Sequence, residues 1–289
     1  MKVYDCFIFF DELDLLEMRF RILDEVVDYF VLVEATKTKS RESKELFFLK
    51  NKERFKKWKE KIIHIIVEDM PKKGKITFGN KWQLDSKLNL GRWKLETYQI
   101  NQIKRGLKNA KNNDIILVSD VDEIPHPNEF EKMKKLLDEN LIIGFSQNFY
   151  YYYLNGFKYA GWIGTKACKY ENFKKNFANS AARVRRMRGW KNRIKRIFGK
   201  KEPIIRNGGW HFSYLSSPES ILHKMKFLCG QEFVKRQVQT VDKIKERIEK
   251  GEDLYGRKLE SINYVPIDST FPEEIQKNQK RYAKFIKEA

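Results

Sequence analysis

Short apolar runs alternate with amphipathic segments through the first half of the chain, and this alternation constrains the fold more than any other feature. The apolar runs span 3–10, 29–33, 62–67, 115–118 and 141–149. In the intervening segments 13–27, 48–58, 95–110 and 130–137, apolar residues recur every three or four positions, as on one face of a helix. This pattern predicts βαβ units with right-handed crossovers, and therefore an α/β fold with a mostly parallel sheet flanked by helices.

The length of the chain suits a single large α/β domain or a core domain with a smaller appendage. It has 289 residues, 41% of them hydrophobic and 14% aromatic, which is enough to bury a sizeable core. No low-complexity linker separates the halves, so we place only a soft boundary near residue 155, between 1–155 and 156–289.

The fourth apolar run leads directly into three acids. Asp120, Asp122 and Glu123 follow Val118 and precede Pro125. Open α/β sheets bind their ligands at the carboxyl ends of the strands, where these acids are expected to lie. Two aspartates one residue apart can bind a divalent cation, and their hard oxygen ligands suit Mg²⁺ or Mn²⁺. The alternative is that Asp and Pro simply form a turn.

The second half carries aromatic and glycine signals. A tyrosine run at 150–153 precedes Asn155-Gly156 and Gly161-Trp162-Ile163-Gly164, which predicts turns with exposed aromatic side chains. Trp162 is a candidate for stacking on a sugar ring, with core packing as the alternative. His211 follows a glycine pair that would let the backbone approach a ligand. Beside an Asp-x-Asp, it is a candidate metal ligand, although a loop histidine can equally be structural.

The charge of the chain favours anionic partners. Fifty-nine basic and thirty-nine acidic residues give a net charge of +20. The segment Arg183 to Ile197 combines arginines and lysines with apolar residues at helical spacing, which predicts a basic amphipathic helix on an anionic membrane surface. A solvated helix packed on the domain is the alternative. Nucleic-acid binding is not expected, because no nucleic-acid motif accompanies the charge.

The cysteines and the apolar segments indicate in which cellular compartment the protein is expected. Cys6, Cys168 and Cys229 are widely spaced, so neither a disulfide framework nor a zinc site is indicated. Asp5 interrupts the apolar start of the chain, which argues against a secretory signal. No run approaches the roughly 18 apolar residues that span a bilayer. We therefore expect a cytoplasmic protein, with peripheral membrane contact through the basic segment.

Six short blocks resemble, in the same order, those of glycosyltransferase family 17, which is typified by β-1,4-mannosyl-glycoprotein β-1,4-N-acetylglucosaminyltransferase. The blocks are 4–7, 10–17, 33–36, 98–103, 119–125 and 208–213. The resemblance implies a GT-A fold with a helical C-terminal part, in which 1–155 binds the nucleotide-sugar and 156–289 forms the acceptor side. It also implies a UDP-sugar donor carrying N-acetylglucosamine, a divalent cation and inversion at the anomeric carbon. The acceptor is expected to be a glycan or a lipid-linked saccharide.

The resemblance also implies roles for individual residues. Asp122 would bind the cation directly, Asp120 through water or by holding the ribose, and His211 would complete the site. The remaining candidates are Asp11, Glu34 and Asn101 for uracil or ribose, Arg105 or a basic residue of 183–206 for the diphosphate, and Trp162 and Trp210 for the acceptor. Capping and turn formation are the alternatives for the first three. A solvated surface role is the alternative for each basic residue. An inverting transfer needs a general base. Glu232 is placed first, and Glu123, Glu171 and Glu219 are the other candidates.

Two other classes of protein fit parts of the sequence. A haloacid dehalogenase-like phosphohydrolase also uses Asp-x-Asp after a buried strand, with the first aspartate as nucleophile. Here, however, the acids lie in the middle of the chain, and Ile124 occupies the position where that class has Thr or Val. A noncatalytic basic protein that binds a membrane or nucleic acid is the second alternative.

Overall fold

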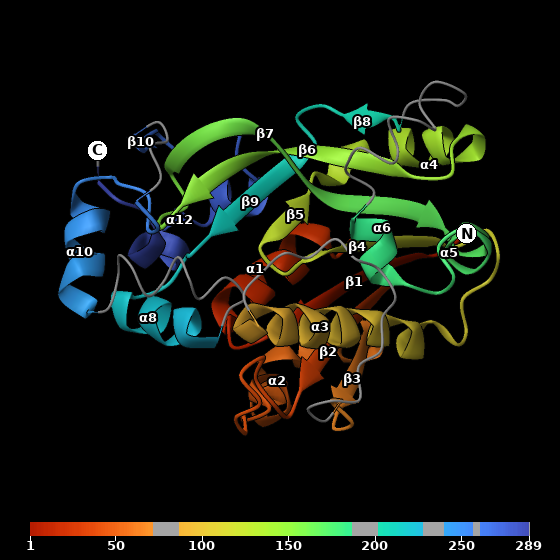
Figure 1. Cartoon of the computed structure of the whole chain (residues 1–289). Helices are drawn as coiled ribbons and strands as arrows, with labels where there is room; N and C mark the ends of the chain where they lie inside the picture. The colour runs from red at the N-terminus through yellow and green to blue at the C-terminus, as the bar shows by residue number, and fades with distance from the viewer. Residues whose placement is uncertain (72–86, 187–201, 228–239, 257–260, 289) are drawn as a thin grey trace.

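The computed structural model describes residues 1–71, 87–186, 202–227, 240–256 and 261–288. Within them, a ten-stranded sheet has the order β3-β2-β1-β4-β7-β6-β9-β5, with β8 and β10 at its sides (Figure 1). The first four strands in this order are parallel, and their bounds are β1 Val3–Phe9, β2 Tyr29–Ala35, β3 Ile62–Val67 and β4 Ile115–Asp120.

The rest of the sheet is mixed. β7 pairs antiparallel with both β4 and β6, and β9 pairs parallel with β6 and antiparallel with β5. The bounds are β5 Glu123–Pro125, β6 Ile143–Tyr151, β7 Gly156–Lys169, β8 Ile204–Ile205, β9 Gly209–Ser213 and β10 Asn263–Tyr264. The predicted α/β class is therefore confirmed. Because β7 begins at Gly156 and joins β4, the segments on either side of residue 155 share one sheet.

Helices cover both faces of the sheet because successive residues of each strand point to opposite sides. Val3, Phe7 and Phe9 of β1 belong to one apolar cluster together with residues of α1 and α4, whereas Tyr4 and Cys6 belong to a second cluster with residues of α3 and α6. The helices in the first two thirds of the chain are α1 Leu13–Leu23, α2 Phe47–Lys50, α3 Lys87–Asn101, α4 Phe130–Glu139, α5 Tyr170–Lys175 and α6 Ala181–Arg185. The 3-10 helices there are η1 Lys52–Lys61, η2 Gln102–Leu107 and η3 Pro127–Glu129.

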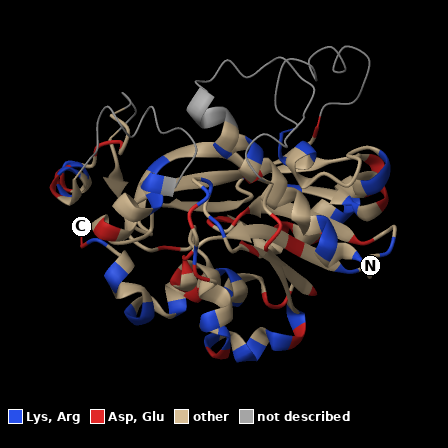
Figure 2. Ribbon diagram, turned by 60° about the horizontal axis from the view of Figure 1, so that its bottom comes forward, with Lys and Arg blue, Asp and Glu red and all other residues tan. Residues whose placement is uncertain are grey.

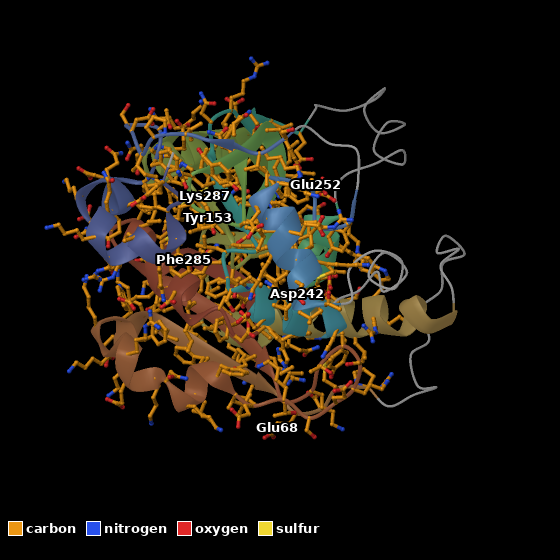
Figure 3. The ribbon with its side chains drawn as sticks, turned by 90° about the vertical axis from the view of Figure 1, so that its left-hand side faces the viewer. Glu68, Tyr153, Asp242, Glu252, Phe285 and Lys287 are labelled. Carbon is orange, nitrogen blue, oxygen red and sulfur yellow. The ribbon has the colours of Figure 1, made fainter. Side chains whose placement is uncertain are left out.

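A third apolar cluster lies at one end of the sheet. Phe149 and Tyr151 of β6 pack there against α8 (Pro218–Phe227) and α10 (Val241–Glu249), which lie side by side in Figure 1. The C-terminal segment docks on the turn after β6, where the Leu154 amide donates to the Phe285 carbonyl at 2.8 Å. Figure 3 shows Phe285 and Lys287 beside Tyr153. The last helices are α11 Glu273–Lys277, α12 Gln279–Tyr282 and η4 Ala283–Phe285.

Two predictions about local structure are wrong in part. A turn does follow the tyrosine run, at 152–155, but the run is not exposed: Tyr150 and Tyr151 lie in β6 and are 2% and 1% exposed, and Tyr152 in the turn is 3% exposed. The glycines after it belong to a fourteen-residue strand, β7, because the C-terminal helices cover this hairpin and bury its aromatic side chains. The segment 48–58 is not one helix but α2 followed by η1.

The described helices and the distribution of charge both bear on membrane contact. No helix in the described ranges combines the length and the apolar character needed to cross a bilayer. Figure 2 shows Lys and Arg on helices around the whole ribbon, interspersed with Asp and Glu. Of the predicted basic helix, Arg183 to Arg186 are described, and the part from residue 187 to Ile197 lies outside the described residues.

Candidate active site

A cavity of about 230 Å³ lies at the carboxyl ends of the central parallel strands. Phe9 and Phe10 line it from the end of β1, Ala35 from the end of β2 and Asp120 from the end of β4. β1 pairs with β2 on one side and with β4 on the other. The chain therefore reverses its direction of winding at this point, which is where open α/β sheets bind nucleotides.

The acidic turn between β4 and β5 is held by a buried arginine. Arg19 of α1 is 0% exposed, and its Nη1 donates to the carbonyl oxygens of Asp120, Val121 and Glu123 at 3.1, 3.2 and 2.9 Å. A buried guanidinium offers five donors in a fixed plane, so it can fix several carbonyl groups at once. This contact positions the backbone from which the acidic side chains enter the cavity.

The charge of Arg19 is balanced by Asp5 of β1, which is also fully buried. Nε and Nη2 donate to the two oxygens of Asp5 at 2.7 and 2.6 Å, and Nη2 also donates to Ser119 Oγ at 2.7 Å. A buried charge is tolerated only when it is paired and hydrogen-bonded, as here. Sequence reasoning missed this pair, although Arg19 stands between Leu16 and Phe20 on the apolar face of a helix, and Asp5 interrupts an apolar strand.

Asp120 and Glu123 share a second arginine. Arg185, the last residue of α6, binds both oxygens of Asp120, with Nη2 to Oδ2 at 2.6 Å, and its Nη2 lies 3.3 Å from Glu123 Oε2. Burial alone would raise the pKa of Asp120, but the guanidinium outweighs that effect and lowers it. Glu123, 1% exposed, also accepts from Trp162 Nε1 at 2.9 Å and from the Asp120 amide at 2.9 Å.

Asp122 faces His211. Glu123 pairs with His211 in the register of β5 and β9, and this brings His211 Nε2 to 3.4 Å from Asp122 Oδ2. Burial opposes ionisation of both groups, but each stabilises the charge of the other, so the pKa of His211 is raised and that of Asp122 falls to about 2. The imidazole packs against Phe149 and Trp162, with ring centroids 4.6 and 4.9 Å away.

Basic side chains complete the lining of the cavity. Lys224 of α8 binds Glu12 at 2.5 Å, and Glu12 also accepts from the Asp11 amide at 3.1 Å. Lys39 pairs with Glu96, and both line the cavity. Sequence reasoning missed Lys39 and Lys224 as site residues and offered Arg185 only as one of the basic residues of 183–206, because lysine and arginine occur throughout this chain and carry little information by position.

The acidic and histidine side chains of the cavity are the candidate ligands for a divalent cation. Across the described part of the chain, no group of three His, Cys, Asp or Glu residues is placed to hold a metal ion. Asp122 and His211 do converge, and the buried His211 Nδ1 has no hydrogen-bond partner among the described residues. Mg²⁺ is usually held by one or two carboxylates together with substrate phosphates. The residues therefore fit a cation that is bound jointly by the protein and a diphosphate.

The other predicted donor residues lie apart from the cavity lining or are engaged elsewhere. Asn101 accepts from Ser180 Oγ at 2.9 Å and from the Ala182 amide at 3.1 Å, so it caps α6. Arg105 pairs with Asp69 at 2.6 Å. Glu34 is fully buried and accepts from Lys44 at 3.2 Å.

Asp11 adjoins the cavity through its neighbour Glu12. Burial raises the pKa of Asp11 to about 6, with a further contribution from the negative charge of Glu12.

The structure separates the acceptor and base candidates. Trp162 lies beside His211, whereas Trp210 is 2% exposed and donates to the Thr270 carbonyl at 2.8 Å. Glu171 and Glu219 form ion pairs with Lys175 and Lys245 and do not line the cavity. Glu232 lies outside the described residues.

The chain is similar to known proteins in sequence and in fold. The profile of glycosyltransferase family 17 matches residues 1–280. No curated protein sequence gives a significant match. Among solved structures, residues 1–349 of Staphylococcus aureus TarS are 12% identical with a TM-score of 0.40, covering 84% of this chain and 68% of that one. The same protein in complex with UDP-GlcNAc is 11% identical with a TM-score of 0.42, covering 84% and 69%. Francisella tularensis 2-C-methyl-D-erythritol 4-phosphate cytidylyltransferase is 9% identical with a TM-score of 0.35, covering 86% and 99%.

Proposed function

Since the chain belongs to glycosyltransferase family 17, it is a glycosyltransferase, and we propose that it transfers N-acetylglucosamine from a UDP-sugar to a saccharide acceptor with the help of Mn²⁺ or Mg²⁺. The observation that carries this proposal is the convergence of Asp120, Asp122 and His211 on a cavity that is also lined by lysines. Family membership favours this function over a phosphohydrolase and over a noncatalytic basic protein.

The nucleotide would occupy the ends of β1 and β2. Phe10 and Thr38 line this part of the cavity, and Asp11 adjoins it. The diphosphate would lie toward Lys39 and Lys224, since phosphate groups are bound by cationic side chains. Glu34, engaged by Lys44, would contribute by holding that lysine in the lining rather than by contacting the ribose itself.

Asp122 and His211 would hold the divalent cation, with Asp120 contributing once it leaves Arg185. When bound, the cation neutralises negative charge that develops on the departing diphosphate. The protein's own part is to orient these ligands. Arg19 fixes the carbonyl groups of the turn, and β9 fixes the imidazole. Lys224, close enough to stabilise the charge of Asp122, would offset part of the diphosphate charge.

The acceptor would bind on the face of β7 that carries Trp162. The Trp162 indole is partly exposed and packs against the His211 ring, so its exposed part is a suitable platform for a sugar. In the transfer, an acceptor hydroxyl oxygen attacks the anomeric carbon, the bond from that carbon to the diphosphate breaks, and the hydroxyl proton passes to a carboxylate. Both oxygens of Glu123 already accept hydrogen bonds, so we assign it to orienting Trp162 and keep Glu232 as the proposed base.

Asp122→Asn tests the proposal. In wild type, UDP-N-acetylglucosamine should raise the melting temperature only with Mn²⁺, because a ligand that binds only the folded state stabilises it. The variant should lose this shift, and turnover of the donor should fall by about 100-fold or more. Asp138→Asn is the matched control, since Asp138 is an exposed partner of Lys169. Full donor turnover in Asp122→Asn would refute the metal role, and no response of wild type to any UDP-sugar would refute the donor.

A further inference from the structure

Arg185 is held beside the acidic turn by contacts that fix helix α6. The side chain of Ser180 caps α6 by accepting from the Arg183 amide at 3.3 Å, and Asn101 of α3 binds Ser180 and the Ala182 amide. Val184 is fully buried in the core beneath. The position of the Arg185 backbone is therefore fixed by the fold, and its guanidinium is directed to Asp120.

This arrangement conflicts with a cation at Asp120. Arg185 engages both carboxylate oxygens, so Asp120 cannot offer them to a divalent ion while the pair persists. The pair is only partly covered, because the side chains of Arg185 and Asp120 are 21% and 40% exposed. A ligand can therefore reach it without unfolding the core.

The guanidinium suits a second partner. Its planar fork binds phosphate oxygens as well as it binds carboxylate oxygens, in the same two-pronged geometry. If a cation takes Asp120, the contacts that Arg185 keeps to the acidic turn are the longer ones from Nη2 to the two oxygens of Glu123, at 3.3 and 3.4 Å. A diphosphate bound beside the same cation would then satisfy the released donors.

We propose that Arg185 is a donor-binding residue that exchanges partners: it pairs with Asp120 in the empty protein and with the donor diphosphate once the cation occupies Asp120. This inference rests on the proposed function. It assigns to Arg185 two opposing effects, since the residue competes with the cation and assists the nucleotide.

Arg185→Gln should therefore shift two affinities in opposite directions. Without competition, the full chain should bind Mn²⁺ alone about tenfold more tightly, the factor expected for loss of one charge-assisted hydrogen bond. With saturating Mn²⁺, it should bind UDP about tenfold more weakly. Isothermal titration calorimetry measures both without relying on turnover. Arg186→Gln is the matched control, because the neighbouring Arg186 is exposed and bonds the Thr97 hydroxyl instead, and it should change neither affinity.

The outcomes separate this inference from the proposed function. If wild type binds neither Mn²⁺ nor UDP, the proposed function fails. If wild type binds both and Arg185→Gln leaves UDP affinity unchanged, or weakens UDP without strengthening Mn²⁺, the exchange is refuted. Should Arg185→Gln not fold, Arg185→Lys keeps the charge and removes the fork. It should show the same opposite shifts at smaller size, and shifts of equal sign would again refute the exchange.

Discussion

Replacing Arg19 with Met tests whether the buried arginine positions the acidic turn. The substitution removes six hydrogen bonds, two of them to Asp5, one to Ser119 and three to carbonyl groups. It also leaves Asp5 as a buried carboxylate without its counter-ion. Breaking a buried ion pair in this way costs about 3–5 kcal/mol, a large fraction of the roughly 5–15 kcal/mol that stabilise a whole domain. Urea denaturation followed by circular dichroism would measure the loss.

A second variant separates stability from positioning. Arg19→Met combined with Asp5→Leu removes both charges, and apolar replacements of buried ion pairs are often close to neutral. The double variant should therefore be more stable than the single variant by about 3 kcal/mol, the lower end of the cost of breaking the pair. It still lacks the donors that held the carbonyl groups of Asp120, Val121 and Glu123, so Mn²⁺-dependent binding of UDP should stay weak.

Two results would contradict this reasoning. A loss of less than about 1 kcal/mol in Arg19→Met would mean that Asp5 finds another way to bury its charge. Recovery of both stability and UDP binding in the double variant would mean that Arg19 supports the fold but does not position the turn.

Three further predictions concern neighbouring groups. In EDTA, wild type should be more stable than Asp122→Asn, and the difference in unfolding free energy should be full just below pH about 6.5, the pKa of an unfolded histidine. The difference should shrink as pH rises through the raised pKa of His211, because the imidazole then loses the charge that pairs with Asp122. A difference that stays constant to pH 9 in urea denaturation would argue against the pair. Asp11→Asn should raise the melting temperature increasingly from pH 4 to pH 6 and no further above it, because wild type loses stability as pH rises through the raised pKa of about 6; an equal gain at pH 4 and pH 8 would refute this. Gly164→Ala should lower stability by about 1–3 kcal/mol in urea, since its Cβ would clash with the buried Gln147 Oε1 and lie 2.7 Å from the carboxyl carbon of Glu123; an unchanged midpoint would show that both side chains can move.

The parallel half of the sheet was predictable because its signals are local. Each of the first strands is an apolar run, and each connection carries a helical period, so pairing follows from right-handed crossovers. The place of Asp120 also followed, since the carboxyl end of a strand in such a sheet lies at the ligand-binding edge. The hairpin of β6 and β7 was not predictable in the same way. Its tyrosines and glycines resemble an exposed turn until the C-terminal helices, more than sixty residues later, cover them.

The arginines that bind the acidic turn could not be predicted from local sequence patterns, for a related reason. Arg19 contacts Asp120 across 101 residues, and Arg185 contacts it across 65. An isolated arginine in a sequence with 59 basic residues gives no sign of which carboxylate it will meet. A buried charge on an apolar helix face was the one available signal, and it applied to Arg19 but not to Arg185.

The three acids of the turn look equivalent in the sequence, but the fold gives each a different environment. Asp120 is 40% exposed and paired with a removable arginine, Asp122 is 15% exposed and paired with an imidazole, and Glu123 is 1% exposed and bound from several sides. Exposure and exchangeable partners are what a ligand-binding carboxylate needs, whereas a buried carboxylate with fixed donors can only orient its neighbours. We therefore expect that Asp120 and Asp122, rather than Glu123, would hold the proposed cation. Glu123 bonds both the Trp162 indole and the Asp120 amide, so under the proposed function one short segment would connect the acceptor side to the donor side.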